Sequence, residues 1–246
     1  MIKFFRRIRY DLMEKNKTGK YLKYAIGEII LVVIGILIAL SINNWNTNRA
    51  QKQKEQILLS ALHNEFKANK IQLDSVVFYG MSSLKSNAYL LTRLPIKDVK
   101  KENLDSLSIH LWNHTNIWTF NPSNGVTSSI MNSSSINIIS NNELRQLLVG
   151  WNDLLLDYQE EEINAFNNYH TLLKSYEKKH FLWSNKGMLI DSRVDLSFLT
   201  SLEFDNYVLD RENDLSQILN NNQGELEAII IAIDKIIELS EPKNND

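Results

Sequence analysis

The stretch IGEIILVVIGILIALSI, residues 26–42, decides the fold class, and Glu28 is its only charged residue. From Tyr24 to Trp45 a helical chain would rise roughly 32 Å, because an α-helix rises about 1.5 Å per residue. The hydrocarbon core of a bilayer is about 30 Å thick, so the stretch predicts a transmembrane helix. We assign residues 24–43 to this helix, 1–23 to a basic cytoplasmic leader and 44–246 to an extracytoplasmic helical domain.

Basic residues gather on one side of this stretch. Residues 1–23 hold eight Lys and Arg residues against two acidic ones, a net charge of +6, whereas the rest of the chain has a net charge of −8. Since basic residues that flank a first span stay on the cytoplasmic side, we expect the N-terminus inside and the bulk of the chain outside. In a bacterium this is the periplasmic face of the inner membrane. The leader is also amphipathic, with Ile2, Phe5 and Leu12 at helical spacing, which suits contact with anionic headgroups as well as a plain topology signal.

A cleaved secretory signal is the alternative interpretation of the same stretch. Ala39 and Ser41 are small residues suited to cleavage after Ser41. Against cleavage, the apolar run continues through Ile42, and Tyr24 and Trp45 bracket it as aromatic belts bracket a spanning helix. We therefore favour a retained anchor.

The composition predicts an all-α protein. Only 8 Gly and 3 Pro occur in 246 residues, so helix breakers are scarce, and the chain has no Cys. The region after the apolar stretch holds about 200 residues, which is enough for one domain with a sizeable core.

Apolar residues in this region recur at alternating steps of three and four. The first helix is expected from Asn46 to about Leu94, and it can continue directly out of the membrane, with Gly80 as a point of bending and Leu94-Pro95 as its end. Its buried face is predicted to comprise Leu59, Leu62, Phe66, Asn69, Leu73, Val76 and Gly80.

The remaining helices follow the same rhythm. A short helix is expected from Glu102 to Asn113, and Thr115–Asn142 is expected to be irregular because it is rich in Asn, Ser and Thr. A long helix should begin at Asn142, with a stripe that includes Tyr169, Leu172 and Tyr176, and a last helix should run from Ser201 to Leu239. An N-terminal transmembrane helix followed by an up-and-down bundle of long helices is the predicted fold.

Two segments resemble a known family. Residues 1–46, MIKFFRRIRYDLMEKNKTGKYLKYAIGEIILVVIGILIALSINNWN, closely resemble the N-terminus of a family of uncharacterised single-span membrane proteins abundant in Bacteroidota and defined by a domain of unknown function. Residues 120–148, FNPSNGVTSSIMNSSSINIISNNELRQLL, resemble its central pattern, although Ser134-Ser135 stands where Ser-Gly is common. The resemblance implies membrane anchoring and a bacterial host, and it brings no activity, substrate or catalytic residue.

Glu28, Gly35 and Ala39 form the first candidate site, a helix-helix contact, because their spacing places them on one face of the apolar helix. Gly35 and Ala39 make a small-xxx-small step suited to close helix packing and homo-oligomerisation. Glu28 lies near the inner boundary, where Lys20 or Lys23 can pair with it. An acidic group in an ion-driven membrane complex is the alternative role.

Candidate chemistry in the remaining sequence is sparse. His110 and His114 have i, i+4 spacing, which can hold a metal, but we favour a partly buried polar pair because no third ligand is identifiable. Glu160-Glu161-Glu162 should point around a helix and not converge. No G-x-S-x-G turn or Gly-rich phosphate loop occurs. We predict no enzyme activity, no cofactor and no metal, and the short basic leader offers no nucleic-acid-reading module.

We therefore expect a membrane-tethered, non-enzymatic scaffold or sensor whose partners are the lipid bilayer, an unknown protein and a second copy of itself. The segment Thr115–Asn142 is the expected recognition surface, because binding residues tend to lie on loops held by a rigid scaffold. The candidate partner-binding residues are Phe120, Asn121, Asn124, Ser134 and Ser135. An accessory subunit of an ion-driven complex, using Glu28, is the alternative function.

Overall fold

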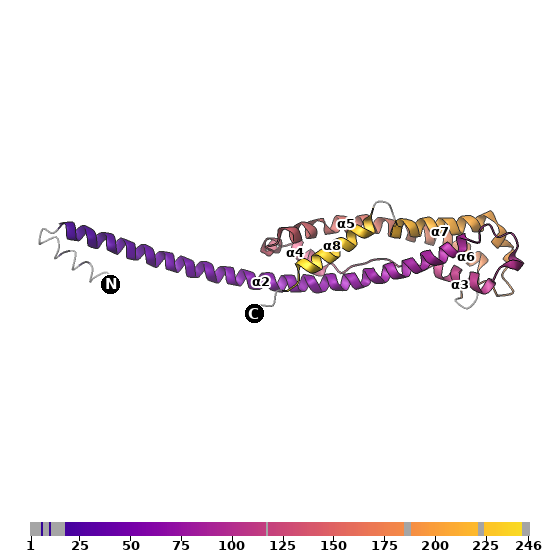
Figure 1. Cartoon of the computed structure of the whole chain (residues 1–246), viewed down its shortest axis with the longest axis horizontal. Coiled ribbons are helices and arrows are strands. Elements are labelled where there is room, and N and C mark those ends of the chain that lie inside the picture. Colours follow the sequence, from indigo (N-terminus) through magenta and orange to yellow (C-terminus); the bar gives the residue numbers. More distant parts are fainter. Residues whose placement is uncertain are drawn as a thin grey trace. The chain divides into compact units, whose positions relative to one another are not determined.

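Helix α2, Thr18–Leu91, is the longest element of the computed structural model, with 74 residues (Figure 1). The structure describes residues 6, 10, 18–116, 118–184, 188–220 and 224–242. These residues form helices and loops without strands, so the all-α prediction is confirmed. The leader residues Ile2, Phe5 and Leu12 lie outside the described residues.

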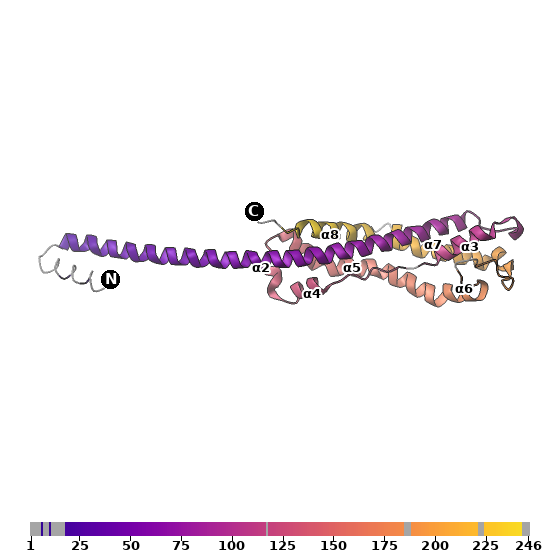
Figure 2. The same ribbon diagram turned by 90° about the horizontal axis from the view of Figure 1, so that it is seen from below.

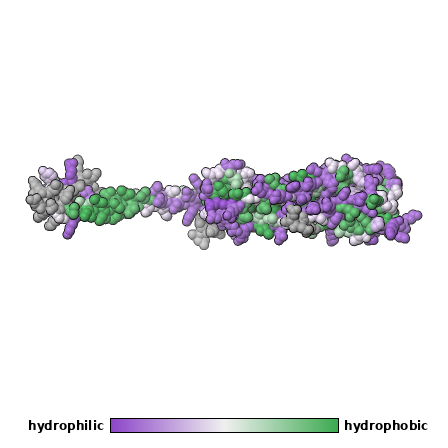
Figure 3. Space-filling model, turned by 90° about the horizontal axis from the view of Figure 1, so that it is seen from above, coloured by the Kyte–Doolittle hydropathy of each residue, from purple (hydrophilic) through white to green (hydrophobic). Residues whose placement is uncertain are grey.

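The N-terminal half of α2 carries the apolar stretch. Within the described residues, α2 is the one helix long and apolar enough to cross a membrane, a property that N-terminal signal sequences share, and none of its apolar window is buried. Figure 3 shows this segment as an unbroken hydrophobic surface. The same helix continues beyond the stretch, as predicted, passes through Gly80, and ends at Leu91, three residues before the expected Leu94.

The chain divides into two units, Met1–Glu55 and Gln56–Asp246. In the second unit α2 lies alongside α5, Asn142–Asn168, α7, Leu202–Asn220, and α8, Glu225–Leu239 (Figures 1 and 2). A first hydrophobic cluster fills the space between α2, α5, α8 and the short α4, Gly125–Met131. Within it, Phe66 packs edge-on against Trp151, with ring centroids 4.8 Å apart.

A second hydrophobic cluster lies around the C-terminal end of α2. It joins Leu90 of α2 to α3, Leu104–His114, and to α7. The short elements that close this end are η1, Val99–Lys101, α6, Lys174–His180, and η4, Leu196–Thr200. The long helices bury their apolar faces between them, which gives the predicted bundle.

A π-helical turn, η3, Tyr169–Leu173, separates α5 from α6 and corrects the predicted buried stripe. A π turn takes in more residues than an α turn, so side chains after it move to a different face. Leu173 is 3 % exposed, whereas Leu172, which the heptad spacing placed inside, is 61 % exposed.

The single last helix predicted from Ser201 to Leu239 is wrong, because the structure has two. Helix α7 ends at Asn220, and α8 begins at Glu225 after Gly224, whose φ of 76° is left-handed. Such a φ favours glycine, which has no Cβ to clash. The break lets both helices keep an apolar face on the bundle.

Thr115–Asn142 is also more regular than predicted. It contains α4 and the 3-10 helix η2, Ser134–Ile138, joined by turns. Ser133 caps η2, because its side-chain oxygen accepts a hydrogen bond from the Ser135 N–H at 3.2 Å. Short polar side chains that cap helices explain why a Ser- and Asn-rich segment is ordered.

Candidate functional site

The segment 120–127 is held by two polar side chains of α2. Glu65, 8 % exposed, accepts hydrogen bonds from the Val126 N–H at 2.7 Å and from the Thr127 N–H at 3.0 Å and hydroxyl at 2.7 Å. Asn124, the residue before α4, makes no capping bond to it. Glu65 therefore satisfies the free N–H groups at the start of α4 from another helix.

Asn69 adds a paired contact one turn further along α2. Its Nδ2 donates to the Ser123 carbonyl at 2.9 Å, and its Oδ1 accepts from the Ser123 N–H at 2.8 Å. Both backbone groups of Ser123 are thus satisfied by one amide. Asn69 was expected in the buried seam, and its partner explains why a polar residue occupies it.

Helix α5 holds the same segment from another side. Both carboxyl oxygens of Glu162 lie within 3.0 Å of the Phe120 N–H, and the Gln159 Nε2 donates to the Phe120 carbonyl at 2.7 Å. The Trp151 Nε1 donates to the Asn124 Oδ1 at 3.2 Å. We call Glu65, Asn69, Trp151, Gln159 and Glu162 the loop clamp.

Glu162 of the loop clamp has a shifted pKa. Burial raises its pKa to about 7, and the hydrogen bond from the Phe120 N–H opposes this shift. A pocket of about 270 Å³ lies beside it, lined by Thr119, Asn121, Gln159, Glu162, Ile163 and Phe166. A buried acid that titrates near neutral pH beside a pocket is a candidate functional group.

The predicted partner-binding residues occupy different environments. Phe120 is fully buried in the first cluster, so its side chain presents no surface to a partner. Asn121 and Ser134 are exposed, and Asn124 and Ser135 are half-buried. Partner binding through these four residues stays a prediction.

His114 is fully buried in a polar network and does not form the expected partly buried pair with His110. Its Nδ1 is 2.8 Å from the Asn87 Oδ1, and its Nε2 is 2.8 Å from the Tyr207 hydroxyl. Burial, assisted by Arg211, lowers the pKa of His114 well below its usual value. The His110 ring instead stacks on Tyr89, with centroids 3.9 Å apart.

The network continues to two buried charged residues. Glu177 accepts hydrogen bonds from the Tyr207 hydroxyl at 2.8 Å and the Tyr169 hydroxyl at 3.1 Å. The Arg211 Nε donates to the His114 carbonyl at 2.8 Å. Glu177 and Arg211 are each 1 % exposed, and their polar contacts join α3, η3, α6 and α7.

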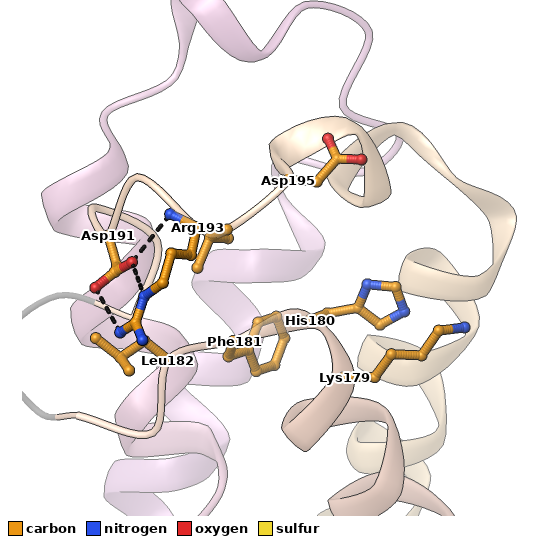
Figure 4. A pocket seen from close by; sticks show the side chains of 8 residues that line it. Lys179, His180, Phe181, Leu182, Asp191, Arg193 and Asp195 are labelled. Atoms are coloured by element: carbon orange, nitrogen blue, oxygen red, sulfur yellow. Dashed lines mark hydrogen bonds and ion pairs between the residues drawn. The ribbon is translucent and has the colours of Figure 1, made fainter.

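A further pocket, of about 280 Å³, lies beside the end of α6 (Figure 4). Its charged side chains stabilise local turns: the Arg193 guanidinium contacts both oxygens of Asp191 at 2.8 and 2.9 Å, and Asp195 accepts from the Ser197 N–H at 2.9 Å. His180 lies against the Phe198 ring, with centroids 5.0 Å apart. Both acidic residues of this pocket therefore interact with residues two positions along the chain.

Glu28, Gly35 and Ala39 lie in α2 within the unit Met1–Glu55. Gly35 and Ala39 are exposed, and a Cβ on Gly35 would meet no described atom within 4 Å. Glu28 is half-buried. A contact of this face with another helix stays a prediction.

The loop clamp and the buried network contain residues that the sequence analysis missed. Glu65, Glu177 and Arg211 were not singled out, and Glu162 was named only within the triplet Glu160-Glu161-Glu162. A signal was available for Glu162, because it follows Leu155 and Tyr158 at the spacing of the buried face of α5. A charged residue at a core position indicates a buried, partnered charge.

These features define an all-α protein in which a helix long and apolar enough to span a membrane continues into a helical bundle with a clamped loop. The chain belongs to DUF6090, a family of unknown function, whose model matches residues 28–169. The match includes the apolar stretch from Glu28 onward, α3, the loop clamp and α5, and it ends before α7 and α8. The search of curated proteins and the search of solved structures each gave no match.

Proposed function

We propose that this protein is a membrane-anchored, non-enzymatic scaffold or sensor module whose bundle lies at the periplasmic face of a bacterial inner membrane. One observation carries the proposal: the apolar stretch and the inner face of the bundle belong to the same helix, α2. An unbroken helix can transmit a displacement or a rotation between its two ends. The expected orientation rests on the net charge of +6 in residues 1–23.

The polar contacts support a binding or structural role. The side-chain oxygens of Glu65 and Asn69 accept hydrogen bonds from backbone N–H groups, and so do those of Glu162 in α5. Groups engaged in this way fix the position of the segment 120–127, which leaves its exposed residue Asn121 available to a partner. Ser134, at the start of η2, is also exposed.

Anchoring and orientation can be tested together in a bacterial host. We expect the full chain to remain in the membrane fraction after an alkaline carbonate wash, with its original N-terminus, and protease added to spheroplasts should digest the region after Trp45. The variant Ile34→Lys/Leu37→Lys, which interrupts the apolar run, should be lost from the membrane. A chain cleaved after Ser41 and released to the periplasm would overturn the proposal.

Partner binding can be tested by a photo-reactive residue at Asn121 or Ser134 in the full chain. Asn167, an exposed residue of α5, is the matched control. We expect one discrete adduct from the two loop sites and not from the control. Identical adducts from all three sites would count against the loop as a recognition surface.

A further inference from the structure

The outer side of α2 has a regular stripe of uncharged residues. Two positions along a helix correspond to a rotation of about 200°, so the residue two after each buried seam residue lies on the opposite face. On α2 these residues, with Ile57 one heptad earlier, are Ile57, Ala61, Asn64, Ala68, Ile71, Ser75, Phe78 and Ser82. We call them the outer stripe. Large residues alternate with small ones along it.

The outer stripe is open to solvent within the unit Gln56–Asp246. Ile57, Ile71 and Phe78 expose 73 %, 70 % and 69 % of their surfaces, and Ala61 alone is half-buried. Solvent-facing positions of a bundle helix are ordinarily polar or charged. Ile57, Ile71 and Phe78 share one series of seven-residue steps, in which Asn64 takes the remaining place. With no charged residue along the stripe, this pattern indicates a second packing face.

Helix α5 provides an internal comparison. The residues two positions after its buried seam residues are Gln146, Gly150, Asp153, Asp157, Glu160, Asn164 and Asn167. Asp153, Asp157 and Glu160 are charged, as expected for a face in water. Helix α5 also exposes Val149, Leu156 and Ile163 at seven-residue intervals, but Asp153 and Glu160 lie between them. The outer stripe of α2 differs in having no charged residue.

We propose that the outer stripe of α2 pairs with the same stripe of a second copy of this chain, with the two helices parallel. In such a pair each residue faces its own counterpart. The small residues Ala68 and Ser75 allow the backbones to approach, and Ile71 fills the space between them. Asn64 would meet Asn64 of the second copy, where the two side-chain amides can hydrogen-bond to each other.

The charges beside the stripe fit this arrangement. In a parallel pair, flanking residues on one helix face those five positions later on the other. Lys67 then faces Gln72 and Asp74 faces Tyr79, so neither places like charges together. Because the outer stripe contains no charged residue, pairing through it would bury no charge of the stripe.

The size of the stripe explains why a shared membrane matters. Its 25 steps from Ile57 to Ser82 span roughly 37 Å, and a helix is about 10 Å wide, which gives a footprint of roughly 400 Å² per copy. Stable complexes in solution bury about 800 Å² per partner. The pairing thus rests on the proposed anchoring for its local concentration and parallel orientation.

Cysteine crosslinking in native membranes tests the pairing, because the natural chain has no Cys. Ser75→Cys in the full chain should yield a disulfide-linked dimer on mild oxidation, since facing small positions lie within the about 7 Å Cα separation that a disulfide requires. Asp153→Cys, at the matched position of α5, should stay monomeric. Co-expression with a differently tagged copy should give a mixed dimer.

A second substitution separates pairing from folding. Adding Ile71→Glu to Ser75→Cys should abolish the crosslink, because two carboxylates would face each other, whereas adding Leu156→Glu on α5 should leave it intact. Equal crosslinking of Ser75→Cys and Asp153→Cys, or no crosslink from Ser75→Cys in retained chain, would overturn the pairing alone. Release of the chain from the same membranes would instead overturn the anchoring on which it depends.

Discussion

Helices α2 and α5 pack against the same core, yet their outer faces differ in kind. Their inner faces keep the same three- and four-residue rhythm and meet at Phe66 and Trp151. On the outer side α5 carries Asp153 and Glu160, whereas α2 carries Ile71. Exposed Leu156 and Ile163 of α5 alternate with these acids, whereas the outer stripe of α2 has no charged residue, and this uncharged face is the one that we propose to pack.

The two helices also differ in continuity. Helix α2 is regular for 74 residues, whereas α5 passes into the π turn η3 before α6 begins. The turn places Tyr169 and Leu173 in the second cluster, where Tyr169 reaches Glu177. Helix α2 reaches both clusters without a break, since Leu73 lies in the first and Leu90 in the second, whereas the α5–α6 arm enters the second cluster through the π turn.

The strongest way to break the common core is to remove an aromatic ring from either helix. Phe66→Ala and Trp151→Ala should each lower the free energy of unfolding by about 3–5 kcal/mol, because each leaves a cavity between buried neighbours. Denaturant unfolding of the full chain in detergent measures the loss. The double variant should lose less than the sum of the two, since the rings contact each other at 4.8 Å. Additive losses would contradict a shared contact.

The π turn gives a sharper test of the α5 side. Leu173→Ala should lower the free energy of unfolding by about 2–5 kcal/mol, because this side chain is buried, and Leu172→Ala should change it by about 0.5 kcal/mol or less. A regular helix through residues 169–173 would reverse this order. The same denaturant titration distinguishes the two outcomes.

Much of the fold could be predicted from residue spacing. The α2 seam from Leu59 to Val76 and the start of α5 at Asn142 follow from apolar periodicity and scarce helix breakers. Leu172 was misplaced because periodicity assumes 3.6 residues per turn throughout. The break at Gly224 was not predicted because the apolar residues after it continue the spacing of those before it.

The loop clamp was harder to predict because its partners are backbone groups. Glu65 and Asn69 bind the main chain of residues 123–127, about 60 positions away in sequence. Since every residue except proline has a main-chain N–H, the residue type does not indicate which N–H a distant side chain will bind. The aromatic residue Phe120 was expected to bind a partner, but burial in the first cluster explains it instead. Glu162 stood at a core position, so its spacing was the available signal.

A pH titration tests the buried Glu162 carboxylate of the loop clamp. Because burial raises the pKa of Glu162 to about 7 from an ordinary value of 4.5, the folded chain binds this proton more tightly than the unfolded chain. Its contribution to stability is therefore full below pH 4.5 and is lost as the pH rises through 7, by about 3 kcal/mol at most. Glu162→Gln should flatten the dependence of unfolding free energy on pH in this window.

Two controls accompany this titration. Glu160→Gln changes an exposed carboxylate of the same helix and should leave the pH dependence as in the natural chain. Glu177 and Asp214 also have pKa values raised by burial, so they contribute a slope of the same sign that persists in both variants. An unchanged slope in Glu162→Gln would show that this carboxyl does not titrate near neutral pH.

The smallest expected effects come from the ion pairs that join each long helix to α8. The Lys70 ammonium of α2 lies 2.8 Å from Asp234, whereas the Glu143 carboxylate of α5 lies 4.0 Å from Lys235. All four side chains are more than a third exposed, so solvent screens both pairs. Lys70→Met should lower the free energy of unfolding by about 0.5 kcal/mol and Glu143→Gln by less, with both losses shrinking at high salt. A loss above about 1 kcal/mol at either site would mean that charge, and not the apolar seam, holds that helix to α8.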